Sequence, residues 1–373
     1  MNLCILYNVD ADLIENDPGR EAREDVTRVA GALGSALRDD GHHVELLGVG
    51  KNPLAFVAAF QENPPDLVVN LCESLAADSR GEMAVPCLLD LLGIPYTGSS
   101  ALSLGLALHK HKAKDLLRGC GVRTPAFRVV EHVEDVVTVD LPFPLIVKPA
   151  REDASVGIEL DSVVRDRAAL GRAVGRILET FKQPALVEQF IEGREIYVPI
   201  LGNQPRRALP LTEIHFGKTF ENRPNIVSYK AKWESESDEY KDSPSGPCSI
   251  EPELEARIVA TAFAAASALD IRDYGRVDVR LSPEGLPYVI DINPNCDLHP
   301  DAGFSRAASA AGISYPALAR RLVEIALERT HGNTSHRPAG QGATRRAPRE
   351  SRTVLAARGG LRSRAHRHRS SGE

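Results

Sequence analysis

The chain has 373 residues, 43% of them hydrophobic and 26% charged, so it is long enough for two or three domains with proper cores. Its net charge of −6 is uneven, because residues 331–373 hold ten arginines against Glu350 and Glu373. The six cysteines form no C-x-x-C pair, and no apolar run approaches the ~18 residues of a membrane span. These features exclude a zinc ribbon, a disulfide framework and a membrane-spanning protein. With no secretory signal expected in MNLCILYNVD, they predict a cytoplasmic protein.

The first hundred residues alternate between strands and helices. Strands are predicted at 2–8, 42–49 and 65–72, the last with a continuous apolar run typical of a strand buried on both faces. Apolar residues recur at helical spacing in 26–37, 53–60 and 83–94. This β-α-β-α-β-α series predicts a small open parallel sheet.

The rest of the chain is predicted to be α+β. We expect helices at 101–120, 166–179, 251–269 and 315–329, and strands at 126–130, 141–150, 158–163, 185–191 and 194–203. The strand at 185–191 is expected to pair with the one at 194–203. The polar segment 229–244 is predicted to be a loop lying over a site, and the tail after Thr330 to be disordered.

A hairpin at 274–293 carries the most informative polar residues. Two alternating apolar runs, YGRVDV and YVIDIN, flank the turn-rich SPEG. Arg276 and Asp278 share a face of the first strand, as do Asp291 and Asn293 on the second, because side chains alternate with a period of two. Oxygen ligands beside a fixed cation suit Mg²⁺ that carries phosphate. The alternative is an ordinary solvated hairpin face.

Candidate phosphate ligands precede the hairpin. Lys148 ends a buried strand and is followed by REDASVG, in which Ser155 and its small neighbours would let backbone N–H groups approach an anion. Lys110 is a second candidate at a helix start. The alternatives are a capped strand end for Lys148 and a solvated helix face for Lys110, because Lys112 and Lys114 are close by.

Two acids and a polar loop complete the set. Glu188 stands at the end of a strand, where it and Glu195 could contact a nucleoside. Lys232 lies in the polar loop beside Trp233, the chain's only tryptophan, and could close on a phosphate. Surface acids and a solvated loop are the alternatives.

Taken in order, the segments resemble the ATP-grasp superfamily, and within it the D-alanine–D-alanine ligase branch, over residues 1–329. The segments that carry the resemblance are VVNLCESL, IPYTGS, the Lys110 segment, RTPAF, PLIVKPAREDASVGIEL, ALVEQFIEGREIYVPILGN, YKAKW, YGRVDV, YVIDINPN and AAGISYPALARRLVEIAL. The resemblance implies an α/β and α+β fold of three domains, with ATP between the second and third. The expected boundaries are 1–105, 106–187 and 188–329, with a basic tail at 330–373.

The resemblance also implies a reaction, in which a carboxylate attacks ATP to give an acyl phosphate and an amine then displaces phosphate. Asp278, Asp291 and Asn293 match the ligands of two Mg²⁺ ions, for which Mn²⁺ is expected to substitute. Lys232 matches a lysine near the γ-phosphate, and Arg276 matches the arginine that stabilises the acyl phosphate. The positions implied to bind ATP are Lys110, Lys148, Ser155, Glu188, Phe190 and Glu195.

The chain departs from the family where the acceptor binds. A glycine and a serine usual there are Asp297 and Ala302 in this chain. With His299 and Asp301, they make a neutral turn charged and titratable. We therefore expect an acceptor that carries a positive or hydrogen-bond-donating group, and substrates other than two D-alanines.

The donor side departs as well. The serine and tyrosine that usually link two loops are Ala154 and Trp233, so that polar link cannot form in its usual way. The glycine-rich signature that presents a glutamate to the donor ammonium is also missing. Glu24 is the position carried forward for that role, with Glu21 and Asp25 as alternatives.

Other functions stay open at this point. The chain could be a genuine D-alanine–D-alanine ligase or a non-catalytic ATP-binding module. A dehydrogenase is disfavoured because the first strand is not followed by G-x-G-x-x-G. We expect small-molecule partners, a homodimer, no membrane and no specific nucleic acid; the arginine-rich tail could touch an anionic surface by charge alone.

Overall fold

The first sheet lies between two hydrophobic cores. In the computed structural model, which describes residues 1–10, 20–50, 52 and 54–333, β1 (Asn2–Asn8) pairs in parallel with β2 (His43–Val49) and β3 (Leu67–Asn70). Leu3 and Ile5 of β1 point into one core, while Cys4 and Leu6 point into the other. Both faces of the sheet are covered, which explains the continuous apolar strands.

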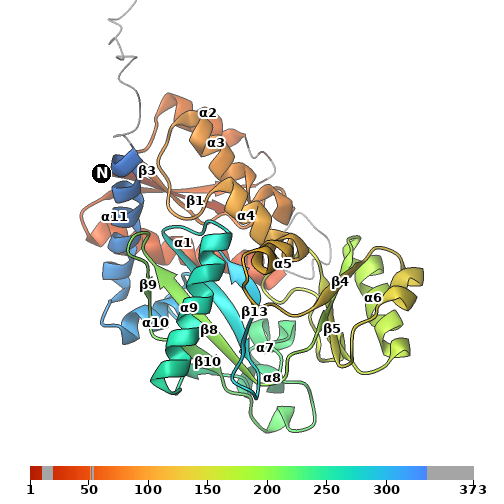
Figure 1. Ribbon diagram of the computed structural model, residues 1–373. Helices are drawn as coiled ribbons and strands as arrows, with labels where there is room; N and C mark the ends of the chain where they lie inside the picture. The colour runs from red at the N-terminus through yellow and green to blue at the C-terminus, as the bar shows by residue number, and fades with distance from the viewer. Residues whose placement is uncertain (11–19, 51, 53, 334–373) are drawn as a thin grey trace, which may run out of the picture. The chain divides into compact units, whose positions relative to one another are not determined.

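Helices from both ends of the chain cover this sheet. Helix α1 (Arg20–Asp39) packs on the same core as α10 (Gly303–Ala310) and α11 (Tyr315–Asn333). Helices α2 (Ala55–Glu62) and α3 (Ala84–Leu92) bury their apolar faces in the other core. The described residues are therefore tied together by contacts between distant segments, as Figure 1 shows for α1 and α11. No described helix is both long and apolar enough to cross a membrane.

The second sheet is antiparallel, in the order β4-β7-β5-β6. Its strands are β4 (Phe127–Val130), β5 (Leu145–Pro149), β6 (Val163–Val164) and β7 (Ala185–Gln189), and α6 (Arg167–Phe181) covers one face (Figure 1). The strand predicted at 158–163 is wrong for most of its length. Glu159 and Ser162 form a reciprocal capping box around a 3-10 turn at Leu160–Ser162, which leaves only β6 to pair with β5.

The third sheet is antiparallel in the order β11-β10-β8-β12-β13, with β9 (Arg207–Ala208) on β8. Its strands are β8 (Arg194–Leu201), β10 (Thr212–Ile214), β11 (Ser245–Pro247), β12 (Tyr274–Leu281) and β13 (Pro287–Asn293). Helix α9 (Pro252–Ala268) lies across it, with α4 (Ala101–Leu108) and α5 (Lys110–Gly119) against the same core (Figure 1). The predicted 274–293 hairpin is confirmed.

Two further expectations are corrected. Strands β7 and β8 do not pair, because the chain crosses between sheets at Gly193, whose φ of +124° suits glycine; a Cβ there would lie 2.1 Å from the Leu281 oxygen. The helix predicted at 101–120 breaks at His109 into α4 and α5.

The polar segment 229–244, predicted as a loop, contains α7 (Tyr229–Trp233) and α8 (Asp238–Lys241). Ser228 and Ser237 cap these two short helices. The predicted disordered tail lies outside the described residues, and the domain boundaries stay a prediction.

Candidate active site between the second and third sheets

One cavity of about 730 Å³ gathers nearly all the residues singled out from the sequence. It is lined by β5, β7 and the loop after β5 on one side and by β8, β12 and β13 on the other. Glu24 is the exception: its side chain is half exposed, pairs with Arg20 at 2.7 Å, and does not line the cavity, whereas Asp25 does. The predicted residues that line it are Lys110, Lys148, Ser155, Glu188, Phe190, Glu195, Lys232, Arg276, Asp278, Asp291, Asn293, Asp297, His299 and Asp301.

The β12–β13 hairpin sets four polar groups side by side. Strand register places Asp278 opposite Asp291, and Arg276 opposite Asn293. The Arg276 guanidinium donates to both Asp278 oxygens at 2.6 and 2.8 Å, and Asn293 Nδ2 donates to Oδ2 of the same carboxylate at 3.2 Å. Arg276 also lies 4.5 Å from the centre of the Tyr197 ring. The guanidinium is thus fixed by a bidentate pair and an aromatic face.

Lys110 connects this hairpin to the loop after β5. Its Nζ donates to both Asp291 oxygens at 2.9 Å and to Asp153 Oδ1 at 2.6 Å. Burial tends to raise the pKa of Asp291, but the ammonium groups of Lys110, Lys148 and Lys114 together outweigh it and hold that pKa below its usual range. Asp153 was not singled out from the sequence, because REDASVG drew attention only to its small residues.

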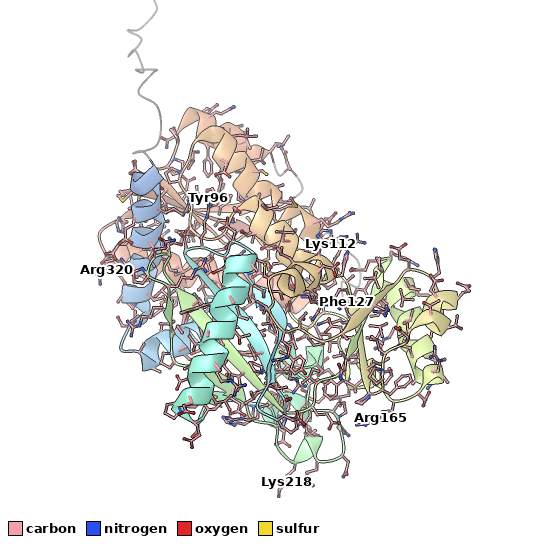
Figure 2. The ribbon with its side chains drawn as sticks, in the orientation of Figure 1. Tyr96, Lys112, Phe127, Arg165, Lys218 and Arg320 are labelled. Carbon is pink, nitrogen blue, oxygen red and sulfur yellow. The ribbon has the colours of Figure 1, made fainter. Side chains whose placement is uncertain are left out.

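A buried charge cluster lies under the cavity. Glu188 is 1% exposed and sits 3.1 Å from Lys148 Nζ and 3.2 Å from Lys114 Nζ. Burial lowers the pKa of Lys114 to about 8, although Glu188 opposes this. Sequence pattern alone does not separate Lys114 from Lys112, which is exposed and labelled in Figure 2. The helix turns one lysine inward and the other to solvent.

The loop after β5 is shaped to expose its backbone. Ala154 and Ser155 have φ values of 54° and 62°, and Gly157 has 78°. Gly157 is required, because a Cβ there would lie 2.6 Å from Pro149. Ser155 Oγ donates to the Val227 oxygen at 2.9 Å, so the loop is joined to the segment that leads into α7. Successive residues in such conformations can form an anion-binding concavity.

Lys232 lies on α7 at the border of the cavity. No described carboxylate forms an ion pair with it, and its Nζ lies 5.3 Å from the Trp233 ring centre. Burial, followed by the charge of Arg276, lowers the pKa of Lys232. A cation held this way is available to an anionic ligand.

Two aromatic rings, Arg280 and the buried Glu195 carboxylate form another part of the cavity wall. Arg280 stacks 5.0 Å from the Phe190 ring centre and approaches Glu195 to 3.7 Å. Tyr197 donates to Glu195 at 3.0 Å. Aromatic and apolar groups beside a buried carboxylate suit a heterocyclic base with hydroxyl groups.

The acidic turn after β13 forms the rim of the cavity. The N–H of His299 donates to Asp297 Oδ1 at 2.7 Å, and the N–H of Asp301 donates to His299 Nδ1 at 3.2 Å. All three side chains line the cavity, and Asp301 is the most exposed of them, at 91%. The turn therefore presents negative charge to whatever enters from this side.

The residues present fit a divalent cation by their chemistry. Among the described residues, no three His, Cys, Asp or Glu side chains converge on one point. On the β12–β13 hairpin, two carboxylates, Asp278 and Asp291, and the Asn293 amide oxygen line the cavity side by side. Mg²⁺ takes this kind of set when substrate phosphates and water complete its shell.

The chain is similar in sequence to known proteins over most of its length. Residues 120–324 match the family model for the C-terminus of D-Ala–D-Ala ligases. An uncharacterised protein, y4sG of Sinorhizobium fredii, is 36% identical over 82% of this chain and 89% of its own length. A D-alanine–D-alanine ligase of Hydrogenovibrio crunogenus is 31% identical over 83% and 92%.

Solved structures show the same fold. The crystal structure of the D-alanine–D-alanine ligase of Bacillus anthracis complexed with ATP aligns with a TM-score of 0.71 at 22% identity, over 89% of this chain and 99% of that one. The fold is therefore the predicted ATP-grasp fold. The chain belongs to the D-alanine–D-alanine ligase family, and is an ATP-dependent ligase that forms carbon–nitrogen bonds.

Proposed function

We propose that this ligase joins an amino-acid-like carboxylate to an amine other than D-alanine, through an acyl phosphate. The observation that carries the proposal is the acidic turn at the cavity rim, where Asp297 and Asp301 flank His299. A carboxylate there attracts a cationic or hydrogen-bond-donating acceptor and repels the carboxylate of D-alanine.

The cationic groups support a place for the nucleotide. We assign Lys110, Lys148 and Ser155 to its phosphates, because they line the cavity beside the exposed backbone of the loop after β5. We assign Phe190 and the Glu188 strand end to the base, and Glu195 to the ribose. Glu188 is already paired with two lysines, so its strand backbone is the part that would contact the base.

The chemistry follows from the hairpin. Asp278, Asp291 and Asn293 would hold two Mg²⁺ ions, or Mn²⁺ in their place, which supply neutralisation of phosphate charge when bound. Arg276 would orient the reacting carboxylate and stabilise the negative charge that develops on it. Lys232 would approach the transferred phosphoryl group while α7 excludes water. No side chain is needed as a nucleophile.

The test is ATP-dependent phosphate release by the full chain with a panel of amino acids and amines, with products identified by mass. We expect little release with D-alanine alone and more with cationic acceptors. Turnover with D-alanine alone at the level of the best pair would make this a genuine D-alanine–D-alanine ligase. No release with any pair would favour a non-catalytic ATP-binding module. The homodimer and the cytoplasmic location stay predictions.

A further inference from the structure

A second, smaller cavity of about 120 Å³ opens off the site. It shares Lys232, Arg276 and Asn293 with the larger cavity, so it adjoins the point where the carboxylate would be activated. Its other walls come from α1, from the segment between β3 and α3, and from α4. The acids that line it are Asp25, Glu73, Glu82, Glu152, Asp153 and Asp297.

Most of these acids already have partners, but among the described residues no cation forms an ion pair with Glu73 or Glu82. No described side chain forms a hydrogen bond or ion pair with the Glu73 carboxylate. Glu82 is only 8% exposed, and its Oε1 accepts one 3.3 Å bond from Asn295. Its Oε2 receives none from the described residues. A buried carboxylate in this condition is costly unless a cation joins it.

The two glutamates are held in place. The Glu73 N–H donates to Asn8 Oδ1 at 3.0 Å, which fixes the turn after β3 to the end of β1. Asn295 also donates to the Cys72 oxygen at 3.1 Å and accepts from the Tyr274 hydroxyl at 2.9 Å. The Asn295 side chain thus joins the backbone next to Glu73 and the Glu82 carboxylate to the end of β13.

The charges do not balance within the cavity. Arg276 is engaged by Asp278, and Lys110 takes Asp153, which leaves Lys232 as the lining cation near Glu73 and Asp297. If all three were ionised, the carboxylates of Glu73, Glu82 and Asp297 would outnumber that ammonium by two charges, so without a further cation the two glutamates hold protons. Burial, followed by the Asp297 carboxylate, raises the pKa of Glu73 to about 8, and burial raises the pKa of Glu82 well above its usual range.

We propose that this cavity selects the carboxylate substrate, and that the substrate is a short diamino carboxylic acid whose two ammonium groups pair with Glu73, Glu82 and Asp297. The inference rests on the proposed function and specifies the chemical class of the carboxylate substrate in that reaction. The space of about 120 Å³ is about one sixth of that of the adjoining 730 Å³ cavity. Such a space suits 2,3-diaminopropionate or 2,4-diaminobutyrate better than the longer lysine or arginine. A neutral side chain of the same size leaves the acids unpaired.

The test compares 2,4-diaminobutyrate with 2-aminobutyrate, both enantiomers of each, because the pair differs only in the second amino group. Binding to the full chain is measured by calorimetry with Mg²⁺ and a non-hydrolysable ATP analogue, and phosphate release is measured in parallel. We expect the diamino acid to bind at least tenfold more tightly. Glu73→Gln and Glu82→Gln should each erase most of that preference, and Glu62→Gln, the same change on the exposed face of α2, should keep it.

Equal binding of the two acids, or a preference that survives both glutamine variants, would overturn the inference. Phosphate release with neutral donors in that case would leave the ligase proposal standing. Conversely, a tenfold binding preference with no phosphate release from any pair would sink the ligase proposal and keep the assignment of the cavity. Melting temperatures of the variants at or above that of the parent chain show that a lost preference is not lost folding.

Discussion

The indole Nε1 of Trp233 donates a 2.9 Å hydrogen bond to the main-chain oxygen of Ala154. At these two positions the sequence comparison with the ATP-grasp ligases leads us to expect a tyrosine and a serine, whose side chains would link the segment that contains α7 to the loop after β5. The Tyr229 N–H also donates to the Ile158 oxygen at 2.8 Å in the same contact. A link between α7 and the loop after β5 therefore exists, but it runs from an indole to the backbone and not between two side chains.

Replacing Trp233 with Phe tests this link, because it keeps a ring and removes the donor. One hydrogen bond is worth about 1 kcal/mol net, so we expect the KM for ATP to rise about fivefold with a smaller change in kcat. ADP release at varied ATP measures both constants. A variant that melts like the parent chain and keeps the parent KM would show that the bond does not hold the nucleotide site closed.

Asp291 and Asp153 offer a matched pair of variants, because each is a partner of the same Lys110 ammonium. If Asp291 is a metal ligand, Asp291→Asn should lower kcat/KM by about 100-fold or more. Asp153→Asn removes the same charge from the same lysine and should leave kcat nearly unchanged. ADP release across a Mg²⁺ titration separates them, and equal losses would contradict the metal role of Asp291.

We expect Glu188, which lines the cavity, also to stabilise the fold. Glu188→Gln leaves Lys114 and Lys148 buried without a counter-charge, and breaking a buried pair in this way costs about 3–5 kcal/mol. Thermal unfolding should therefore show a fall in Tm of about 10 °C. Glu62→Gln, on an exposed helix face, is the control and should melt like the parent chain. Matching Tm values for the two variants would count against the buried cluster.

The parts of the site that the sequence predicted are those set by local periodicity. Arg276 and Asp278 share a strand face because side chains alternate, and the SPEG turn brings the second strand, with Asp291, beside them. The wrong pairing at 185–203 has the opposite cause. Neighbouring strands usually form a hairpin, but here β7 lies between β4 and β5 and β8 lies between β10 and β12, so both edges of each strand are already paired with other strands.

Charged residues whose role depends on packing could not be predicted. Lys112 and Lys114 have the same local sequence character, yet one is exposed and the other 2% exposed. Glu73 and Glu82 lie in a polar stretch whose composition is typical of a surface turn. They become a pair only because Asn295, more than 200 positions further along the chain, joins their segments.

Glu73 predicts how stability should depend on pH. Its pKa is raised from 4.5 to about 8, so the folded chain keeps a proton there that the unfolded chain has released. Between these two values the unfolded state binds fewer protons, and this group therefore lowers stability as pH rises, by at most about 1.4 kcal/mol per pH unit. Below pH 4.5 Glu73 does not lower the stability of the folded chain, and above about pH 8 its destabilising effect no longer grows.

Glu73→Gln removes this titration, so the difference in Tm between the variant and the parent chain is the quantity to follow. We expect the two to melt nearly alike at pH 5 and the variant to melt higher at pH 8, with the gap widening at each step between. Comparing the two proteins at the same pH cancels the other titrating groups. Glu62→Gln should show no such gap at any pH. A constant offset from pH 5 to 8 would mean that Glu73 is ionised in the folded chain throughout that range, and that its cavity already holds the charge without a ligand.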